Sequence, residues 1–271
     1  MVSQLKKLKF LIVKIFLKLY IFLYKFKDIN IYKKYDLPNL STILSLLDNS
    51  DVYSYMNGMF ISKDLPKSIK YHRFYFSKES RGFGENPFHV LWYLLFDEYK
   101  PKNVLEIGVY RGQILTLWGL ISKEKEIQTN IFGLSPLKNI EDSVSNYIDI
   151  DYEKDIKLHC KEFNIGFPTL VKEYSNSKNG IDFIRSKKWD LIYIDGNHDY
   201  EVAKEDFFNS FYSLAQNGIL VMDDSSLYIN CKKRKGSFKG HPGPSRVCVE
   251  FARRRMVHLG TVGHNNIFQK L

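Results

Sequence analysis

Acidic residues follow directly after two apolar runs of this sequence. The run at 191–194 ends in Asp195, and the run at 219–222 ends in Asp223 and Asp224. Such runs are typical of buried parallel strands, whose carboxyl ends meet along one edge of a sheet. If the two strands are neighbours, three carboxylates repel one another unless a cation lies between them, and their oxygens suit Mg²⁺, Ca²⁺ or Mn²⁺. We therefore expect a divalent-cation site, the alternative being that one acid caps a helix and another faces solvent.

A histidine stands three residues after the first of these acids. His198 belongs to the segment 195–200, DGNHDY, which leads from the apolar run into the next helix. An imidazole has an unperturbed pKa of about 6.5, so beside a cation-bound hydroxyl group it can accept a proton as a general base. The alternative is a surface or helix-capping histidine. Its position beside the expected cation favours the catalytic role.

A glycine-bearing turn follows another apolar run. The segment from Glu106 to Gly112, EIGVYRG, has the form ExGxxxG and also contains Gly108 and Tyr110. Glycines let the backbone approach a ligand, and the N-terminus of the following helix offers N–H groups to a carboxylate or phosphate. Taken alone the pattern is weak, because a tight strand-to-helix turn needs the same glycines.

These segments belong to an alternation of strands and helices, which indicates a parallel sheet covered on both faces. Asn217-Gly218 is expected to end a helix, because glycine readily adopts the left-handed cap conformation. The predicted strands are 103–107, 131–134, 169–173, 190–194, 219–222, 256–262 and 266–270, and the predicted helices are 88–99, 113–121, 200–216 and 245–254.

The first 36 residues read as a basic amphipathic helix. Lysines interrupt its apolar residues, so a transmembrane span is not expected, and no cleavage site of a signal peptide follows. One interpretation is peripheral contact of residues 1–27 with an anionic membrane surface. The other is packing on the protein's own core or on a second subunit, which would give a homo-oligomer. Residues 37–85 are expected to form a helical or loop extension or lid, and residues 86–271 the main domain.

Composition narrows the class of protein. A chain of 271 residues with 44% hydrophobic content supports a sizeable core and excludes a disordered chain. The net charge of +10 suggests an anionic partner, but the basic residues gather in the flanks, at 6–34, 232–239 and 246–255. Three cysteines without CxxC spacing make a disulfide framework or structural zinc unexpected and favour a reducing, cytoplasmic location, with possible peripheral membrane contact.

With these residues in place, the sequence resembles the class I S-adenosylmethionine-dependent methyltransferases. In particular it is similar to the metal-dependent sugar and small-molecule O-methyltransferases of the methyltransferase 24-like group. VLEIGVYRG at 104–112, WDLIYIDGNHDYE at 189–201 and NGILVMDD at 217–224 carry the resemblance, which covers about residues 86–271. It implies a Rossmann-like α/β fold whose seven-stranded sheet has the order 3-2-1-4-5-7-6 and an antiparallel last strand.

The resemblance also implies roles for individual residues and an S-adenosylmethionine-dependent reaction at a hydroxyl group of a sugar, glycan or sugar-bearing metabolite. The implied cofactor contacts are Glu106, Gly108, Tyr110, Gly112, Ser135 and Ser177; the implied Mg²⁺ ligands are Asp195, Asp223 and Asp224; and the implied general base is His198.

Ser135 departs from the family pattern, which normally ends the second strand in an acid that binds both ribose hydroxyl groups. A serine offers one good hydrogen bond without charge assistance, so cofactor affinity would be weaker unless another acid substitutes. This keeps open a degenerate methyltransferase fold that serves as a binding or scaffold protein.

The acceptor is less constrained by the sequence. Lys239, His241 and Arg246, in or beside the basic loop at 232–247, are candidates for contacts with an acidic or phosphorylated acceptor, although the loop could simply be solvated. Nucleic-acid methylation is less expected, because neither a base-methylation motif nor an aromatic-interleaved basic platform is present. His264 reads as part of the turn between the last two strands, with no necessary catalytic role.

Overall fold

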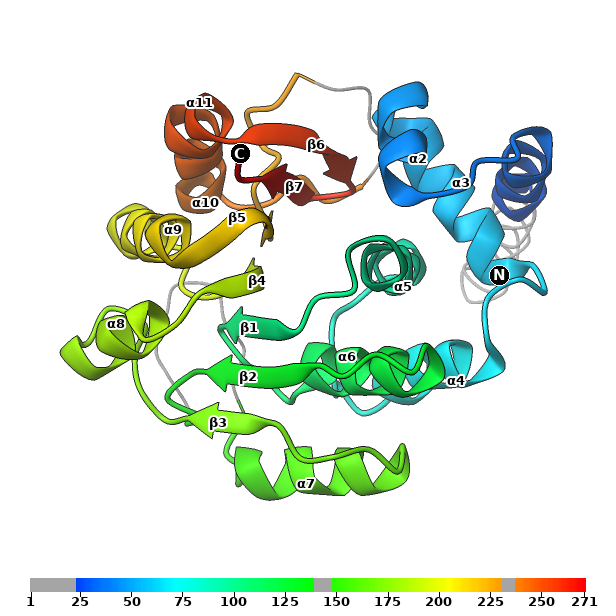
Figure 1. The fold of residues 1–271 in the computed structure, drawn as a ribbon. Coiled ribbons are helices and arrows are strands. Elements are labelled where there is room, and N and C mark those ends of the chain that lie inside the picture. The colour runs from blue at the N-terminus through cyan, green and yellow to red at the C-terminus, as the bar shows by residue number, and fades with distance from the viewer. Residues whose placement is uncertain (1–22, 139–147, 231–236) are drawn as a thin grey trace, which may run out of the picture.

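The strands form one mixed sheet. The computed structural model describes residues 23–138, 148–230 and 237–271. Its strands are β1 (Asn103–Ile107), β2 (Asn130–Leu134), β3 (Thr169–Val171), β4 (Trp189–Ile194), β5 (Leu214–Met222), β6 (Val257–Val262) and β7 (Asn265–Gln269). They lie in the order β3-β2-β1-β4-β5-β7-β6, and β7 runs antiparallel to both of its neighbours (Figure 1). The predicted α/β fold, strand order and antiparallel last strand are confirmed.

Helices cover both faces of this sheet. They are α2 (Leu40–Leu46), α3 (Asn49–Ile61), α4 (Lys67–Phe76), α5 (Asn86–Tyr99), α6 (Gln113–Glu124), α7 (Tyr152–Glu162), α8 (Lys178–Arg185), α9 (Tyr200–Ser213), α10 (Pro242–Val247), the π-helical turn η1 (Cys248–Ala252) and α11 (Arg253–Arg255). Helices α8, α9 and α10 lie on one side of the sheet, and α4, α5 and α6 lie on the other (Figure 1).

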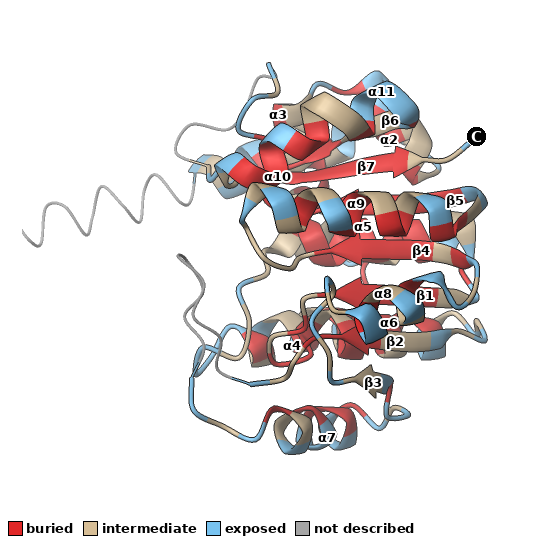
Figure 2. Cartoon of the chain, turned by 90° about the vertical axis from the view of Figure 1, so that its left-hand side faces the viewer, coloured by how far each residue is buried: buried red, intermediate tan, exposed pale blue. Residues whose placement is uncertain are grey.

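Alternate residues of the central strands face opposite helical layers. Ile192 and Ile194 of β4 share a core with Phe207 of α9, whereas Tyr193 packs edge-on against Trp92 of α5 with ring centroids 5.0 Å apart. Both faces of β4 are therefore buried, as Figure 2 shows. This explains why the strand reads as a continuous apolar run rather than as an alternating pattern.

The carboxyl ends of the central strands are aligned. Ile107 at the end of β1 pairs with Ile194 at the end of β4, and Ile194 pairs with Met222 at the end of β5. The ladder continues for one residue, because the N–H of Asp195 donates to the Ile107 oxygen at 2.8 Å and that of Asp223 to the Ile194 oxygen at 2.9 Å. The polar residues that follow β1, β4 and β5 therefore start side by side.

Strand β5 begins earlier than the sequence predicts. The predicted helix 200–216 ends at Ser213, and Leu214, which is buried, already pairs with Trp189 of β4. The left-handed residue is Asn217, with φ 62°, rather than Gly218, and its N–H donates to the backbone oxygen of Lys270 at 2.8 Å. The prediction of a glycine cap is wrong because this segment pairs with the end of the chain.

The helices before α5 share the core of the sheet. Leu40, Met56 and Phe76 of α2, α3 and α4 are fully buried in the same cluster as α5. Residues 23–34 are helical and pack on α3, where the side chain of Asn57 donates to Asp28 at 2.7 Å. The rest of the predicted amphipathic helix, residues 1–22, lies outside the described residues. Within the described part of the chain no helix is both long and apolar enough to cross a membrane.

Candidate functional site

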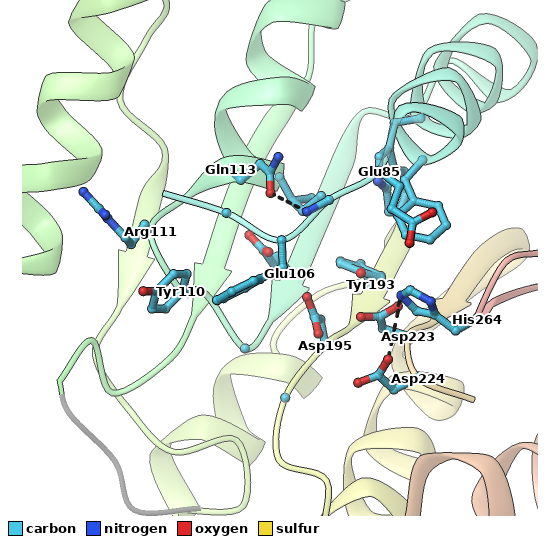
Figure 3. A pocket seen from close by; sticks show the side chains of 18 of the residues that line it. Glu85, Glu106, Tyr110, Arg111, Gln113, Tyr193, Asp195, Asp223, Asp224 and His264 are labelled. Atoms are coloured by element: carbon cyan, nitrogen blue, oxygen red, sulfur yellow. Dashed lines mark hydrogen bonds and ion pairs between the residues drawn. The ribbon is translucent and has the colours of Figure 1, made fainter. Parts of the chain in front are cut away.

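A cavity of about 410 Å³ opens where β1, β4 and β5 end (Figure 3). Its wall is completed by the loop before α5, the first turns of α5 and α6, and residues near the β6–β7 turn. Open α/β sheets bind ligands at this edge. Of the predicted site residues, Glu106, Gly108, Tyr110, Asp195, His198, Asp223 and Asp224 line the cavity, whereas Gly112, Ser135 and Ser177 do not.

The three predicted cation ligands lie together. Burial raises the pKa of Asp195 well above its usual value, and repulsion from Asp223 and Asp224 adds to the effect. Burial also raises the pKa of Asp223, to which the carboxyl group of Asp195 is hydrogen-bonded. Carboxylates crowded at low exposure favour either a shared proton or a cation between them. The arrangement therefore fits a divalent cation.

Three histidines surround Asp224 and extend the donor set beyond the predicted acids. The Nε2 atoms of His198 and His241 lie 3.0 and 3.5 Å from its Oδ2, and the Nε2 of His264 lies 3.8 Å from its Oδ1. The Nε2 of His264 is also 3.3 Å from Oδ1 of Asp223. Asp224 thus directs one oxygen toward each of two histidine groups. Oδ2 lies near the pair His198 and His241, and Oδ1 lies near His264 alone.

Among the residues that the structure describes, two sets of ligand atoms are compact enough to hold one ion. They are His198–Asp224–His241 and Asp223–Asp224–His264, in each of which the ligand atoms lie within 4.8 Å of one another. Asp195 belongs to neither set, although it contacts Asp223. The donor chemistry fits a divalent cation, but with imidazole nitrogen among the ligands rather than three carboxylates alone.

His264, which the sequence places in the turn between the last two strands with no necessary catalytic role, lies against the acids. It precedes β7, and β7 pairs antiparallel with β5 so that Asn266 lies opposite Met222. Counting outward from that pair places His264 opposite Asp224, and the N–H of Ser225 donates to the His264 oxygen at 3.0 Å. The signal was therefore present in the predicted strand order, which brings the start of the last strand to the acidic end of the fifth.

The turn after β1 forms the other side of the cavity. Gly108 has φ 97°, and a Cβ there would lie 2.0 Å from the backbone oxygen of Asp195, so only glycine fits. Burial raises the pKa of Glu106 well above its usual value, although the N–H of Leu115 donates to its carboxylate. Its Oε2 is buried and has no hydrogen-bond partner among the described residues. An ammonium group would satisfy this oxygen.

The loop at 82–85 covers this turn. The N–H of Gly84 donates to Oε1 of Gln113 at 3.1 Å, and Phe83 lies against the ring of Tyr110 with centroids 5.4 Å apart. A Cβ on Gly82 would lie 2.1 Å from the same Gln113 oxygen. Gln113 lines the cavity and was not predicted as a site residue, because in sequence it looked like an ordinary first residue of a helix.

Ser135 and Ser177 use their polar atoms elsewhere. The N–H of Ser135 donates to the Val171 oxygen at 3.1 Å. The hydroxyl group of Ser177 donates to Glu173 at 3.0 Å and accepts from the N–H of Gly180 at 3.0 Å, which caps α8. Gly112 has φ 73° and precedes α6, where it packs against Ile156. The cofactor roles of these three residues stay predictions.

Comparisons with known proteins agree with this fold. A family model described as a methyltransferase domain matches residues 105–225. The methyltransferase PaMTH1 of Podospora anserina, bound to SAH (S-adenosylhomocysteine), is 16% identical, with a TM-score of 0.54 over 76% of this chain and 88% of its own. An O-methyltransferase of Bacillus cereus in complex with SAH is 12% identical, with a TM-score of 0.53 over 82% and 97%. The uncharacterized protein R132 of Acanthamoeba polyphaga mimivirus is 25% identical over 61% of this chain and 72% of its own.

Proposed function

We propose that this protein, which carries a methyltransferase domain of the class I fold, transfers the methyl group of S-adenosylmethionine to a hydroxyl group with the help of a divalent cation. The observation that carries the proposal is the meeting of two groups in one cavity. A buried Glu106 with an unsatisfied oxygen lies on one side, and a carboxylate–histidine cluster lies on the other.

Residues of the β1–α6 turn would bind the cofactor. Oε2 of Glu106 would accept from the ammonium group, and Gly108 leaves the backbone open to the ligand. When bound, S-adenosylmethionine would supply an electrophilic methyl group. A cation held by Asp223 and Asp224, with Asp195 hydrogen-bonded to Asp223, would make the acceptor hydroxyl group more acidic. Holding both reactants in one cavity supplies much of the remaining rate gain.

His198 would accept the proton of the acceptor hydroxyl group. Its Nε2 lies 3.0 Å from Oδ2 of Asp224, and a carboxylate at that distance favours the tautomer with the proton on Nε2. Nδ1 then carries the lone pair, and because Nδ1 is buried, binding of the acceptor would have to turn the ring slightly before this atom takes the proton. Asp224 would orient the imidazole and stabilise its charged form, as carboxylates do in other acid–base pairs.

The acceptor is proposed to be a hydroxyl group of a sugar, glycan or sugar-bearing metabolite. The aromatic part of the lining offers flat apolar surfaces and comprises Phe83, Phe88, Trp92, Tyr110, Tyr193 and Phe238. The acidic part comprises Glu85, Glu106, Asp195, Asp223 and Asp224.

An anionic group of the acceptor would therefore lie at the mouth of the cavity, near exposed Lys239, rather than inside it. Burial lowers the pKa of His89, which also lines the cavity, to about 3, so its ring adds no positive charge. Arg246 lies over the ring of Tyr200 and pairs with Glu250 at 3.3 Å, so it is already engaged.

A binding or scaffold role without catalysis is the second candidate, favoured by the positions of Ser135 and Ser177 outside the cavity lining. Calorimetric titration of the full-length protein with S-adenosylmethionine and SAH separates the two. The enzyme predicts saturable binding of both ligands at a one-to-one ratio. If neither binds, the proposed function is wrong; if both bind, transfer of a labelled methyl group to sugars is measured next.

A further inference from the structure

We infer that His264 is a ligand of the divalent cation proposed above, so that the site takes a transition-metal ion such as Mn²⁺, Fe²⁺ or Zn²⁺ in preference to Mg²⁺. The inference rests on the proposed cation site and adds a nitrogen ligand from the β6–β7 turn. It also assigns a chemical role to a residue that the sequence places only in the turn between the last two strands.

The distances suit a single ion. Nε2 of His264 lies 3.3 Å from Oδ1 of Asp223 and 3.8 Å from Oδ1 of Asp224. Ligands bound at about 2.1 Å lie about 3.0 Å apart at neighbouring octahedral positions and about 3.4 Å apart in a tetrahedron. Small side-chain adjustments would therefore bring the three atoms into the coordination sphere of one ion.

The imidazole is fixed before any ion arrives. The rings of Phe88 and Phe238 meet it edge-on, at centroid distances of 4.8 and 5.3 Å, and Figure 3 shows it directed at the two acids. Beneath it, the side-chain amide of Asn266 donates to the hydroxyl groups of Ser225 and Ser226, both at 2.8 Å. This buried network joins the β6–β7 turn to the end of β5, and such support is typical of metal ligands.

The nitrogen ligand changes which ion is preferred. Mg²⁺ binds oxygen ligands and gives up water reluctantly, whereas imidazole suits Fe²⁺ and Zn²⁺, and Mn²⁺ stands at the weak end of the same first-row series. In the competing interpretation, a protonated His264 is a counter-ion for Asp223 and Asp224. A counter-ion and a ligand differ in one observable, because only a ligand places nitrogen directly on the metal.

Pulsed electron paramagnetic resonance of Mn²⁺ detects that nitrogen. Metal-free full-length protein is loaded with Mn²⁺, and the ¹⁴N coupling is recorded for the wild type and for His264→Gln, His198→Gln and His241→Gln. We expect coupling in the wild type, its loss in His264→Gln alone, and a fall in Mn²⁺ affinity of about tenfold or more in that variant. The preference for Mn²⁺ over Mg²⁺ should fall with it.

Each other outcome overturns the inference in a recognisable way. If wild-type Mn²⁺ shows no ¹⁴N coupling, or if His264→Gln keeps it, His264 is not a ligand while the proposed cation site stands. If the coupling disappears in His198→Gln or His241→Gln instead, the ion binds the other histidine group. If Mn²⁺ does not bind at all, the cation part of the proposed function fails as well. Titration of His264→Gln with SAH shows whether the variant is folded.

Discussion

At the ends of β4 and β5 the wall of the cavity is made of side chains, whereas at the end of β1 it is made largely of backbone. On the first side Asp195, Asp223, Asp224 and the histidines contact one another, so changing one alters the others. On the second side Gly108 leaves the backbone bare and one acid, Glu106, has an unsatisfied oxygen. Because the residues of the first side are coupled, substitutions there should impair the whole cation site together, whereas substitutions on the second side should impair only cofactor binding.

The largest effect is expected at Asp224, where both histidine groups meet. Asp224→Asn removes a cation ligand and offers an N–H to His198, which favours the wrong tautomer, so turnover should fall by about 10³-fold or more. Affinity for SAH should stay within about twofold. Steady-state kinetics and calorimetry measure the two quantities, and Asp199→Asn, on an exposed acid of the loop between β4 and α9, is the matched control. Equal losses in both quantities would show that the two sides are not separate.

A buried acid on α9, next to Gly196 in the loop after β4, should control stability. Burial raises the pKa of Asp206 on α9 from its ordinary 3.8 to about 7. The folded chain then binds more protons than the unfolded chain between these values, so the contribution to stability is full at low pH and is lost as pH rises through 7. Relative to Asp206→Asn, the wild type should lose about 3 kcal/mol of unfolding free energy between pH 5 and pH 8.

Urea unfolding at the two pH values measures this difference. Asp182→Asn, which changes the same charge on the exposed face of α8, should follow the wild type at both pH values. Parallel pH profiles for wild type and Asp206→Asn would show that Asp206 is ionised in the folded protein.

A smaller effect is expected on the second side of the cavity, at the end of β1. Glu106→Gln keeps the shape of the side chain but removes the charge that would face the cofactor ammonium group. Affinity for SAH should fall by about 10-fold to 100-fold, and Mn²⁺ affinity should not change. Calorimetry with each ligand tests both statements. A loss of Mn²⁺ binding in this variant would mean that the two sides are coupled after all.

The smallest effect concerns the chain before α2. Because residues 23–34 pack on α3, peripheral membrane contact, if residues 1–27 make it, is proposed to come from residues 1–22. Deleting them should abolish co-sedimentation with anionic vesicles and leave turnover and both ligand affinities unchanged. Equal co-sedimentation of the full-length and shortened chains would rule out this contact.

The residues at the strand ends were predictable from sequence, because the pattern that identifies them lies within a few consecutive residues. An apolar run followed at once by acids locates Asp195, Asp223 and Asp224, and the family resemblance supplies the strand order that brings them together. His264 and Gln113 reach the cavity from the β6–β7 turn and from the start of α6, so their roles depend on pairing and on helix packing. No short sequence pattern around His264 or Gln113 predicts its role in the site.

Ser135 shows the opposite limit. It stands at the end of β2, as the resemblance requires, yet it is buried and does not line the cavity. A position in a motif fixes where the backbone goes, whereas the contacts of the side chain depend on its own size and hydrogen bonds. The helix boundary at Ser213 was missed for a related reason, because the pairing of residues 214–222 involves the end of the chain.

Cofactor and cation are proposed to occupy the two sides of one cavity. A crystal structure of the full-length protein with SAH and Mn²⁺, with the metal located by its anomalous signal, tests it directly. We predict the ammonium group of SAH at Glu106 and one Mn²⁺ within bonding distance of Asp223, Asp224 and His264. A metal bound elsewhere, or SAH absent from the turn after β1 at saturating concentration, would show that cofactor and cation do not share this cavity.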